Sequence, residues 1–150
     1  MIQRAAALLV PAGFFVVGLC IAACIGGIDR VPEATLANTY WKLIDLDDRV
    51  LVEADWPPPP HLTFSGDLAQ VSGAGGCNRL SGACTVKDTA LTFQPMAMTK
   101  MACARGMETE QAFSAALERT RRWRIVNNVL ELSDESGSIL ARLAAVAPST

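Results

Sequence analysis

The chain has 150 residues, of which 51% are hydrophobic and 19% are charged. This is enough apolar material for one hydrophobic core, but the chain is too short for two domains that each have a core of their own. The formal net charge is −2, and the basic residues form no long block. A nucleic-acid binder needs a surface that neutralises phosphates, so we expect one domain and no nucleic-acid partner.

The first 24 residues have the composition of an export signal. One charge, Arg4, precedes an apolar run over residues 5–21, and small residues follow. This charged, apolar, small-residue order is typical of a secretory signal. A membrane-spanning helix is the alternative, but it needs about 20 apolar residues with anchoring flanks. The run here contains Pro11, Gly13 and Gly18, so we interpret residues 1–23 as a signal peptide.

The end of this segment, Ile21-Ala22-Ala23-Cys24, resembles a bacterial lipobox. An aliphatic residue and two small residues precede the cysteine that becomes lipid-modified. Cys20 fits poorly, because the bulky Leu19 precedes it. Several acyl chains on Cys24 would anchor the protein stably, whereas one chain is marginal. Ile25, in place of Asp, favours the outer membrane in a Gram-negative host, facing the periplasm. Residues 24–38 then form the lipidated cysteine and a tether.

Short alternating runs dominate the next part of the chain. Tyr40–Leu46 is rich in aromatic and aliphatic residues and predicts a strand, with Asp47-Asp48 as a turn. The four prolines of residues 57–60 cannot donate hydrogen bonds to a sheet, so we expect an extended polyproline segment in a surface loop. Further antiparallel strands, each with one wet face, are predicted at residues 61–64, 70–73 and 90–93.

A helix and three strands are predicted in the last third. Residues 108–119 are full of helix formers, with acidic residues at the start and arginine at the end. Phe113, Ala116 and Leu117 share the face that should lie on a sheet. After the helix, alternation predicts antiparallel strands at residues 122–126, 129–132 and 139–143, with turns at 127–128 and 134–137.

Three cysteines remain besides Cys24 and Cys20. Six residues separate Cys77 from Cys84, and eighteen separate Cys84 from Cys103. Structural zinc sites usually pair cysteines two to four residues apart, and a Cys₃His site completed by His61 would use every candidate. No C-x-x-C redox motif is present. An exported chain matures under oxidising conditions, so we expect one disulfide. Pairing Cys77 or Cys84 with Cys103 stabilises by roughly 3.5 kcal/mol either way, so energetics do not choose.

Three stretches, residues 76–82, 91–103 and 107–113, resemble the META domain of the heat-shock protein HslJ family. Residues 41–43 and 130–133 fit the same pattern, so the resemblance covers residues 39–145 and leaves 146–150 as a tail. Its most specific part is GCN-x-x-x-G followed by T-x-M-A-C. The motif residues are Gly76, Cys77, Asn78, Gly82, Thr99 and Cys103.

The resemblance implies an α+β fold of mainly antiparallel strands in a partly barrel-like sheet, with one packed helix. It also implies a disulfide between Cys77 and Cys103. Cys84 departs from the family, which commonly has an aromatic residue there. It is therefore either a buried small hydrophobe or a spare reactive thiol, and we expect burial.

A methionine cluster offers an alternative function. Thioethers and thiolates are the soft ligands that Cu(I) prefers, so a periplasmic copper binder is conceivable. Methionine is also an adaptable core filler, and we favour this role inside the family pattern. The cluster comprises Met96, Met98, Met101 and Met107, close to Cys103.

Catalysis has few candidates. His61 is the one histidine and has no neighbouring nucleophile motif, so we interpret it as a solvated loop histidine. The carboxylates of Glu108, Glu110, Asp134 and Glu135 suit a helix start and a turn. We interpret the arginines at 119, 121, 122 and 124, around Trp123, as a solvated face.

We therefore expect a non-enzymatic, lipid-anchored envelope protein without a cofactor, which binds or stabilises another envelope protein. The family resemblance further implies a link to heat or envelope stress and to tolerance of antibiotics such as novobiocin.

Overall fold

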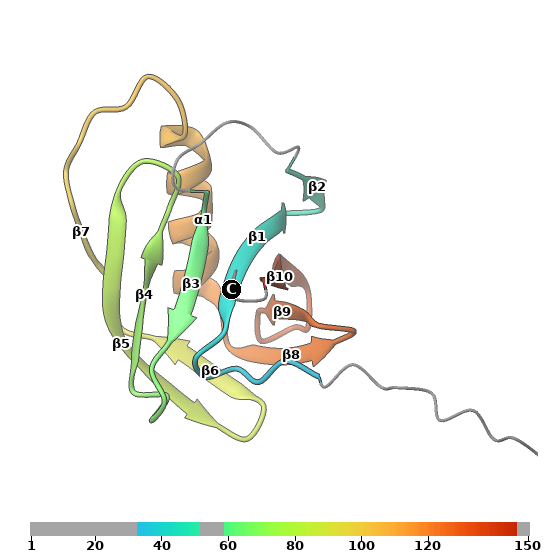
Figure 1. The fold of residues 1–150 in the computed structure, drawn as a ribbon. Coiled ribbons are helices and arrows are strands. Elements are labelled where there is room, and N and C mark those ends of the chain that lie inside the picture. The colour runs from blue at the N-terminus through green and yellow to red at the C-terminus, as the bar shows by residue number, and fades with distance from the viewer. Residues whose placement is uncertain (1–32, 52–58, 147–150) are drawn as a thin grey trace, which may run out of the picture. The chain divides into compact units, whose positions relative to one another are not determined.

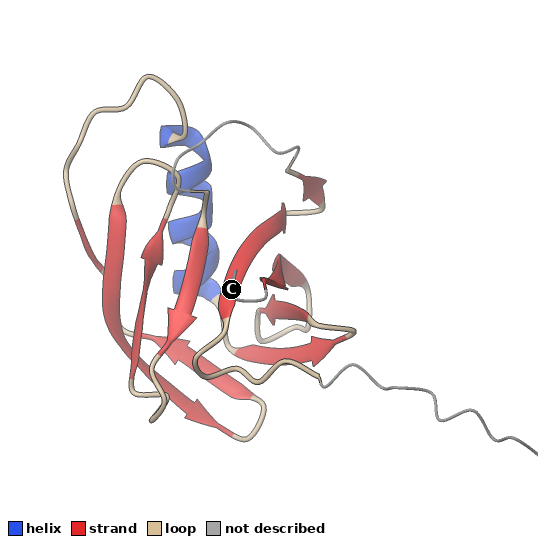
Figure 2. Cartoon of the chain, viewed as in Figure 1, coloured by secondary structure: helices blue, strands red, loops and turns tan. Residues whose placement is uncertain are grey.

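The computed structural model describes residues 33–51 and 59–146. The expected signal peptide, Cys24 and most of the expected tether lie outside the described residues, as do Pro57 and Pro58. The described part contains ten strands and one helix (Figures 1 and 2). The elements are β1 (Tyr40–Leu46), β2 (Arg49–Val50), β3 (His61–Phe64), β4 (Gln70–Ala74), β5 (Arg79–Lys87), β6 (Ala90–Phe93), β7 (Ala97–Met98), α1 (Met107–Arg119), β8 (Arg122–Val126), β9 (Val129–Ser133) and β10 (Ile139–Val146).

Eight strands close into a barrel. Neighbouring strands run in the order β10, β9, β8, β6, β5, β4, β3, β1, and pairing of β1 with β10 completes the circle. All these pairs are antiparallel. The two-residue strands β2 and β7 pair with β1 and β5. The predicted α+β fold with a barrel-like antiparallel sheet and one helix is confirmed.

The barrel interior is filled by alternate residues of each strand. Along β1, Trp41 and Leu43 are buried, while Tyr40 and Lys42 are half-buried. This period of two places one face of each strand in the core and the other toward solvent. The Trp41 indole Nε1 donates a hydrogen bond of 3.0 Å to the Leu36 carbonyl, so the largest core side chain also satisfies its polar atom.

The ends of the domain extend slightly beyond the expected bounds. Leu36 is buried in the core, and Ala37 forms a parallel bridge with Phe64. The expected tether over residues 24–38 therefore overlaps the packed domain at its end. At the other end, Val146 belongs to β10 and pairs with Tyr40. Residue 146, expected in the tail over residues 146–150, is therefore part of the barrel.

The last three strands form the predicted meander. Asn127 and Asn128 have φ values of 51° and 61°, the left-handed geometry expected for a tight turn between β8 and β9. Trp123 packs against the core, while Arg122 and Arg124 are exposed. The predicted strands end at residues 132 and 143, but β9 and β10 continue to Ser133 and Val146.

Three strands have no bounded counterpart in the sequence prediction, namely the two-residue β2 and the strands β5 and β7. β5 is the longest strand, with nine residues, although Ser81 and Gly82 interrupt its apolar pattern. β7 has two residues and is too short to show a period. Pro60 also differs from the expected surface loop, because it is buried and its carbonyl accepts a hydrogen bond of 2.9 Å from the Leu43 amide.

The helix α1 packs its Phe113, Ala116 and Leu117 face against the sheet, with contacts to β1, β6 and β10. In Figure 1 it lies behind β3 and β4. Strands β6 and β8 share one register pair, Ala90 with Arg122, and the chain between them contains β7 and α1. Within the described ranges, no helix has the length and apolar character needed to cross a membrane.

Candidate functional site

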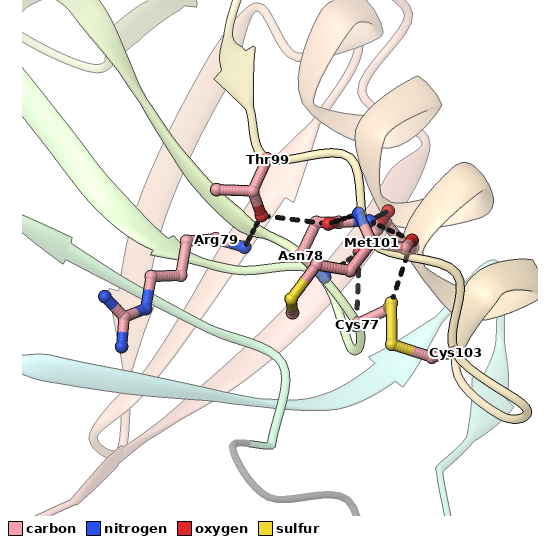
Figure 3. Close-up of a disulfide and its surroundings, with 7 residues drawn as sticks. Cys77, Asn78, Arg79, Thr99, Met101 and Cys103 are labelled. Carbon is pink, nitrogen blue, oxygen red and sulfur yellow. Dashed lines mark hydrogen bonds between the residues drawn. A yellow bond between two sulfur atoms is a disulfide. The ribbon is translucent and has the colours of Figure 1, made fainter.

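The family motif residues meet at one junction, where the start of β5 lies beside the segment between β7 and α1. Asn78 immediately precedes β5, and Thr99 follows β7 (Figure 3). The Arg79 and Thr99 backbones are joined, because the Thr99 amide donates to the Arg79 carbonyl at 3.1 Å. Segments about twenty residues apart are therefore held side by side.

Asn78 is at the centre of the junction and uses its whole side-chain amide. Its Oδ1 accepts from the Thr99 hydroxyl at 2.8 Å and from the Met101 amide at 2.7 Å. Its Nδ2 donates to Glu110 Oε1 at 2.8 Å and to the Met101 carbonyl at 3.3 Å. The residue is 3% exposed. An asparagine offers two donors and two acceptor lone pairs, so its capacity is filled within the protein.

Glu110 supplies the negative charge of the junction. Its carboxylate Oε2 accepts hydrogen bonds from the backbone amides of Cys77, at 3.1 Å, and Asn78. Its Oε1 accepts from the Asn78 side chain. The residue is 6% exposed, and a carboxylate at such a position needs strong partners to offset its lost hydration. The three donors provide them, and they tie α1 to the turn before β5.

Glycines allow the backbones to approach each other at this point. A Cβ at Gly75 would lie 2.6 Å from Glu110 Cγ. Gly106, the N-cap of α1, has φ 88°, and a Cβ there would lie 2.7 Å from the Gly76 carbonyl oxygen. Any larger residue at position 106 would meet backbone and adopt a left-handed conformation that only glycine adopts readily. Gly76 and Gly106 are therefore set by close packing.

The disulfide closes the same junction. Cys77 and Cys103 are bonded, with Cα atoms 5.8 Å apart and a sequence separation of 26. This is the pairing implied by the family resemblance. The Cys77 sulfur lies 3.4 Å from the Met101 carbonyl, a contact without a shared proton because an oxidised sulfur carries none. By loop-closure entropy, the bond stabilises the fold by roughly 3.5 kcal/mol.

Cys84 is a free cysteine buried in the core, as expected from the sequence. Burial raises the pKa of its thiol, and the Asp67 charge raises it further. Its Sγ donates to the Leu68 carbonyl at 3.2 Å. A thiol that stays protonated and covered is a poor nucleophile, so Cys84 serves as a small apolar residue.

Neither metal hypothesis gains support from this geometry. The disulfide withdraws Cys77 and Cys103 from a Cys₃His zinc site. Among the described residues no group of three His, Cys, Asp or Glu side chains is arranged around a common point. Copper binding by the methionine cluster stays a prediction. Met96 and Met98 pack against the core, whereas Met101 is 56% exposed. Cys103 is oxidised and offers no thiolate ligand.

His61 differs from the expected loop histidine. It is the first residue of β3, and its ring stacks on Tyr40 with centroids 4.4 Å apart and planes 18° from parallel. Its Nδ1 lies 2.7 Å from the Pro59 carbonyl, which only accepts hydrogen bonds, so Nδ1 carries the proton. The ring is thereby held on the outer face of the barrel.

Glu110 lies in the first turn of α1, as expected from the sequence, but sequence reasoning missed its second role. Its carboxylate points inward and accepts hydrogen bonds from Asn78. A signal was available: Glu110, Phe113 and Leu117 lie three and seven positions apart, on one helical face. A carboxylate on the apolar face of a helix indicates a buried partner. The partner itself lies 32 positions away and leaves no local pattern.

Comparison with known proteins identifies the family of the described domain. A model of the META domain matches residues 34–147, which include every element described above. The chain belongs to the META domain family. Membership supports an envelope- or stress-related module in general terms. No curated protein sequence matches the chain.

Solved structures share the fold seen here. The chain is similar to an NMR structure of a protein from Burkholderia xenovorans, with 28% identity, a TM-score of 0.61, and coverage of 75% of this chain and 84% of that one. A second NMR structure has 23% identity and a TM-score of 0.56 over 74% and 95% of the two chains. A DUF4847-family crystal structure from Bacteroides vulgatus, with 17% identity and a TM-score of 0.50 over 73% and 93%, resembles it in fold alone.

Proposed function

We propose that this META domain is a non-enzymatic, lipid-anchored envelope module that binds or stabilises another envelope protein. The proposal rests on one observation: the polar groups of the family motif already have hydrogen-bond partners within the protein. Asn78, Glu110 and Thr99 direct their polar atoms to one another or to backbone, and Cys77 is bonded to Cys103. Residues occupied in this way maintain a rigid scaffold and leave recognition to the surface.

The lipid anchor and the compartment are argued from the sequence. Ile21-Ala22-Ala23-Cys24 has the lipobox order, and Ile25 favours forwarding to the outer membrane. A structural disulfide suits an oxidising compartment such as the periplasm. Acylation at Cys24 would place the barrel at the membrane surface, close to other envelope proteins.

Metabolic labelling with a fatty acid tests the anchor. The full chain and its Cys20→Ala variant should both incorporate label and remain with the membrane fraction. Cys24→Ala should lose both the label and the membrane association. Cys20 is a matched control, because it is the other cysteine of the same segment. Label retained in Cys24→Ala would refute the assignment.

Crosslinking in intact envelopes tests the partner. The tagged wild-type chain should recover at least one envelope protein that an unrelated lipoprotein of similar abundance does not recover. The same partner should be missing when Cys24→Ala removes the protein from the membrane. Recovery no greater than that of the unrelated lipoprotein would count against a binding role.

Stress and antibiotic tolerance form the physiological part of the proposal and rest on the family resemblance. Deletion of the gene should lower survival after heat shock or in novobiocin. Restoring the wild-type chain should recover survival, whereas Cys24→Ala should not. Equal survival of the deletion and parent strains would remove this part of the proposal.

A further inference from the structure

A depression lies on the outer face of the barrel and borders the Asn78 junction at Arg79 and Thr99. It has a volume of about 550 Å³ and spans strands β3, β4, β5 and β7. Small side chains line much of it, whereas His61 and Arg79 are its larger polar residues. Ligand pockets commonly have volumes of about 300–1,000 Å³, so a small organic molecule fits. The small residues are Ser72, Gly73, Ala74, Ser81 and Ala97.

The register of the sheet places His61 and Arg79 opposite each other. His61 pairs with Ala74 on β4, and Ala74 pairs with Arg79 on β5. Neighbouring strands lie about 4.8 Å apart, so the two Cα atoms are separated by roughly 10 Å with one alanine between them. Ala74 is 1% exposed and forms the floor of the depression between the two larger side chains. In the adjoining row, Ser72 pairs with Ser81.

Arg79 is the one formally charged residue among those that line the depression. None of its lining residues is acidic. The Arg79 guanidinium has no hydrogen bond or ion pair with the described residues, whereas Arg119, Arg124 and Arg142 each pair with a carboxylate. Its backbone is fixed, because the Arg79 amide donates to the Thr99 hydroxyl at 3.1 Å. Arg79 is therefore an exposed cation on a rigid base.

Polar groups complete the surroundings of Arg79. The hydroxyls of Ser72 and Ser81 have no partner among the side chains and backbone described for this domain, and each can donate one hydrogen bond. On the side of the depression opposite Arg79, the His61 Nδ1–H donates a hydrogen bond to the Pro59 carbonyl. In the neutral ring Nε2 is therefore an acceptor. The stack on Tyr40 fixes the ring plane.

We infer that this depression is a binding site for a small organic anion, whose carboxylate or phosphate group is held by Arg79 with Ser72 and Ser81. Guanidinium groups form bidentate hydrogen bonds with both kinds of oxyanion. The His61 Nε2, about 10 Å away at the backbone, meets a hydroxyl or another donor of the same molecule. No covalent step is involved, and the Asn78 junction takes no part beyond supporting Arg79.

Titration of the ¹⁵N-labelled full chain in non-ionic detergent with inorganic phosphate and, separately, with acetate tests the site. Saturable shifts are expected at the Arg79 side-chain Nε–H and at the amides of Ser72 and Ser81. Arg79→Gln should weaken binding about 10- to 100-fold, since charge-assisted hydrogen bonds contribute roughly 1.5–3 kcal/mol. Arg122→Gln, which removes an equal charge from exposed β8, should titrate as wild type.

Each outcome decides the inference. Saturation by phosphate alone, by acetate alone or by both supports the site and assigns its oxyanion class. Shifts that grow linearly with either salt, or that persist unchanged in Arg79→Gln, would overturn it. The unperturbed spectrum of Arg79→Gln before titration shows that the variant is folded, so loss of binding is not confused with unfolding.

Discussion

The β8–β10 meander and the Asn78–Glu110 junction hold the same barrel together by different means. In the meander, the strands follow one another in sequence, and the pairings of β8 with β9 and of β9 with β10 are formed between neighbours. At the junction, a side chain on α1 bonds the turn before β5 across 32 positions. Local pattern specifies the first region, while buried polar contacts specify the second.

The carboxylates in the two regions show the same contrast. Glu131 on β9 lies on the outer face of the barrel, where its side chain is 14% exposed and pairs with Arg124 and with Arg142, the latter at 3.3 Å. Glu110 has no cation among its hydrogen-bond partners and is held by amides. An ion pair with an exposed partner contributes little, because water competes for the charge. Removal of a buried carboxylate instead leaves its hydrogen-bond donors unsatisfied. Substitutions at the junction should therefore cost more.

The largest effect is expected for Glu110→Ala. It removes an acceptor from three donors in the junction, and each unsatisfied donor costs about 1–3 kcal/mol, so the free energy of unfolding should fall by about 3–5 kcal/mol. Equilibrium urea unfolding followed by tryptophan fluorescence measures the change. Glu108→Ala is the matched control in the same helical turn, where the side chain is exposed and the loss should be within about 0.5 kcal/mol. Equal losses in the two variants would show that the buried contacts of Glu110 contribute no more than an exposed carboxylate at the helix start.

Reduction of the disulfide should have the next largest effect. Opening the Cys77–Cys103 bond should lower the free energy of unfolding by about 3.5 kcal/mol, because the unfolded chain regains loop entropy. Urea unfolding with and without dithiothreitol measures the difference. The Cys77→Ala, Cys103→Ala double variant should be insensitive to dithiothreitol. A response in that variant would place the redox-sensitive group elsewhere.

A backbone effect of moderate size is expected in the meander. Asn127→Ala should destabilise by about 1 kcal/mol, because alanine is disfavoured at φ 51°. Asn127→Gly should be close to neutral, since glycine adopts this conformation freely and its higher unfolded-state entropy costs little. Thermal unfolding of the pair separates conformation from side-chain contact. Equal losses in both variants would show that the asparagine side chain matters more than the turn geometry.

A smaller effect is expected for the exposed ion pair. Arg124→Ala should lower the free energy of unfolding by no more than about 1 kcal/mol, since Arg124 is 65% exposed on its side chain. The difference from wild type should shrink as salt is raised to about 1 M, where screening acts within a few ångströms. Urea unfolding at low and high salt tests both points. A loss comparable with that of Glu110→Ala would contradict the comparison.

The Cys84 thiol on β5 should affect the pH dependence of stability only at high pH. Its folded-state pKa is raised by burial and then by Asp67, so the neutral thiol is favoured in the fold. At pH 7 both states hold a neutral thiol. Above roughly pH 8.5 the unfolded thiol ionises first, and stability is lost as pH rises. The stability difference between wild type and Cys84→Ala should therefore change above that pH, and a constant difference would contradict this.

The sequence predicted the parts of this molecule that depend on local pattern. The bounds of β1, β3 and β6 were predicted to the residue, and the asparagine turn has the expected geometry. These features need only alternation and turn chemistry, which a single chain displays. The family resemblance added the disulfide pairing and the barrel.

The remaining features depend on contacts that leave no local trace. β5 was not bounded, because its serine and glycine residues interrupt the apolar pattern while pairing with β4, β6 and β7 specifies it in space. The role of Glu110 depends on Asn78, and the depression between His61 and Arg79 depends on the register of three strands. Positions of this kind become visible only after the chain has folded.

Hydrogen exchange at the Asn78 backbone amide tests most directly whether the family motif forms a structural junction. This amide precedes β5 and donates to the Glu110 carboxylate instead of a strand carbonyl. It should exchange as slowly as core amides such as that of Leu130, with a protection free energy close to that of global unfolding. Exchange faster by several orders of magnitude, as in a frayed turn, would contradict the assignment of Asn78 and Glu110 to the rigid framework of the barrel.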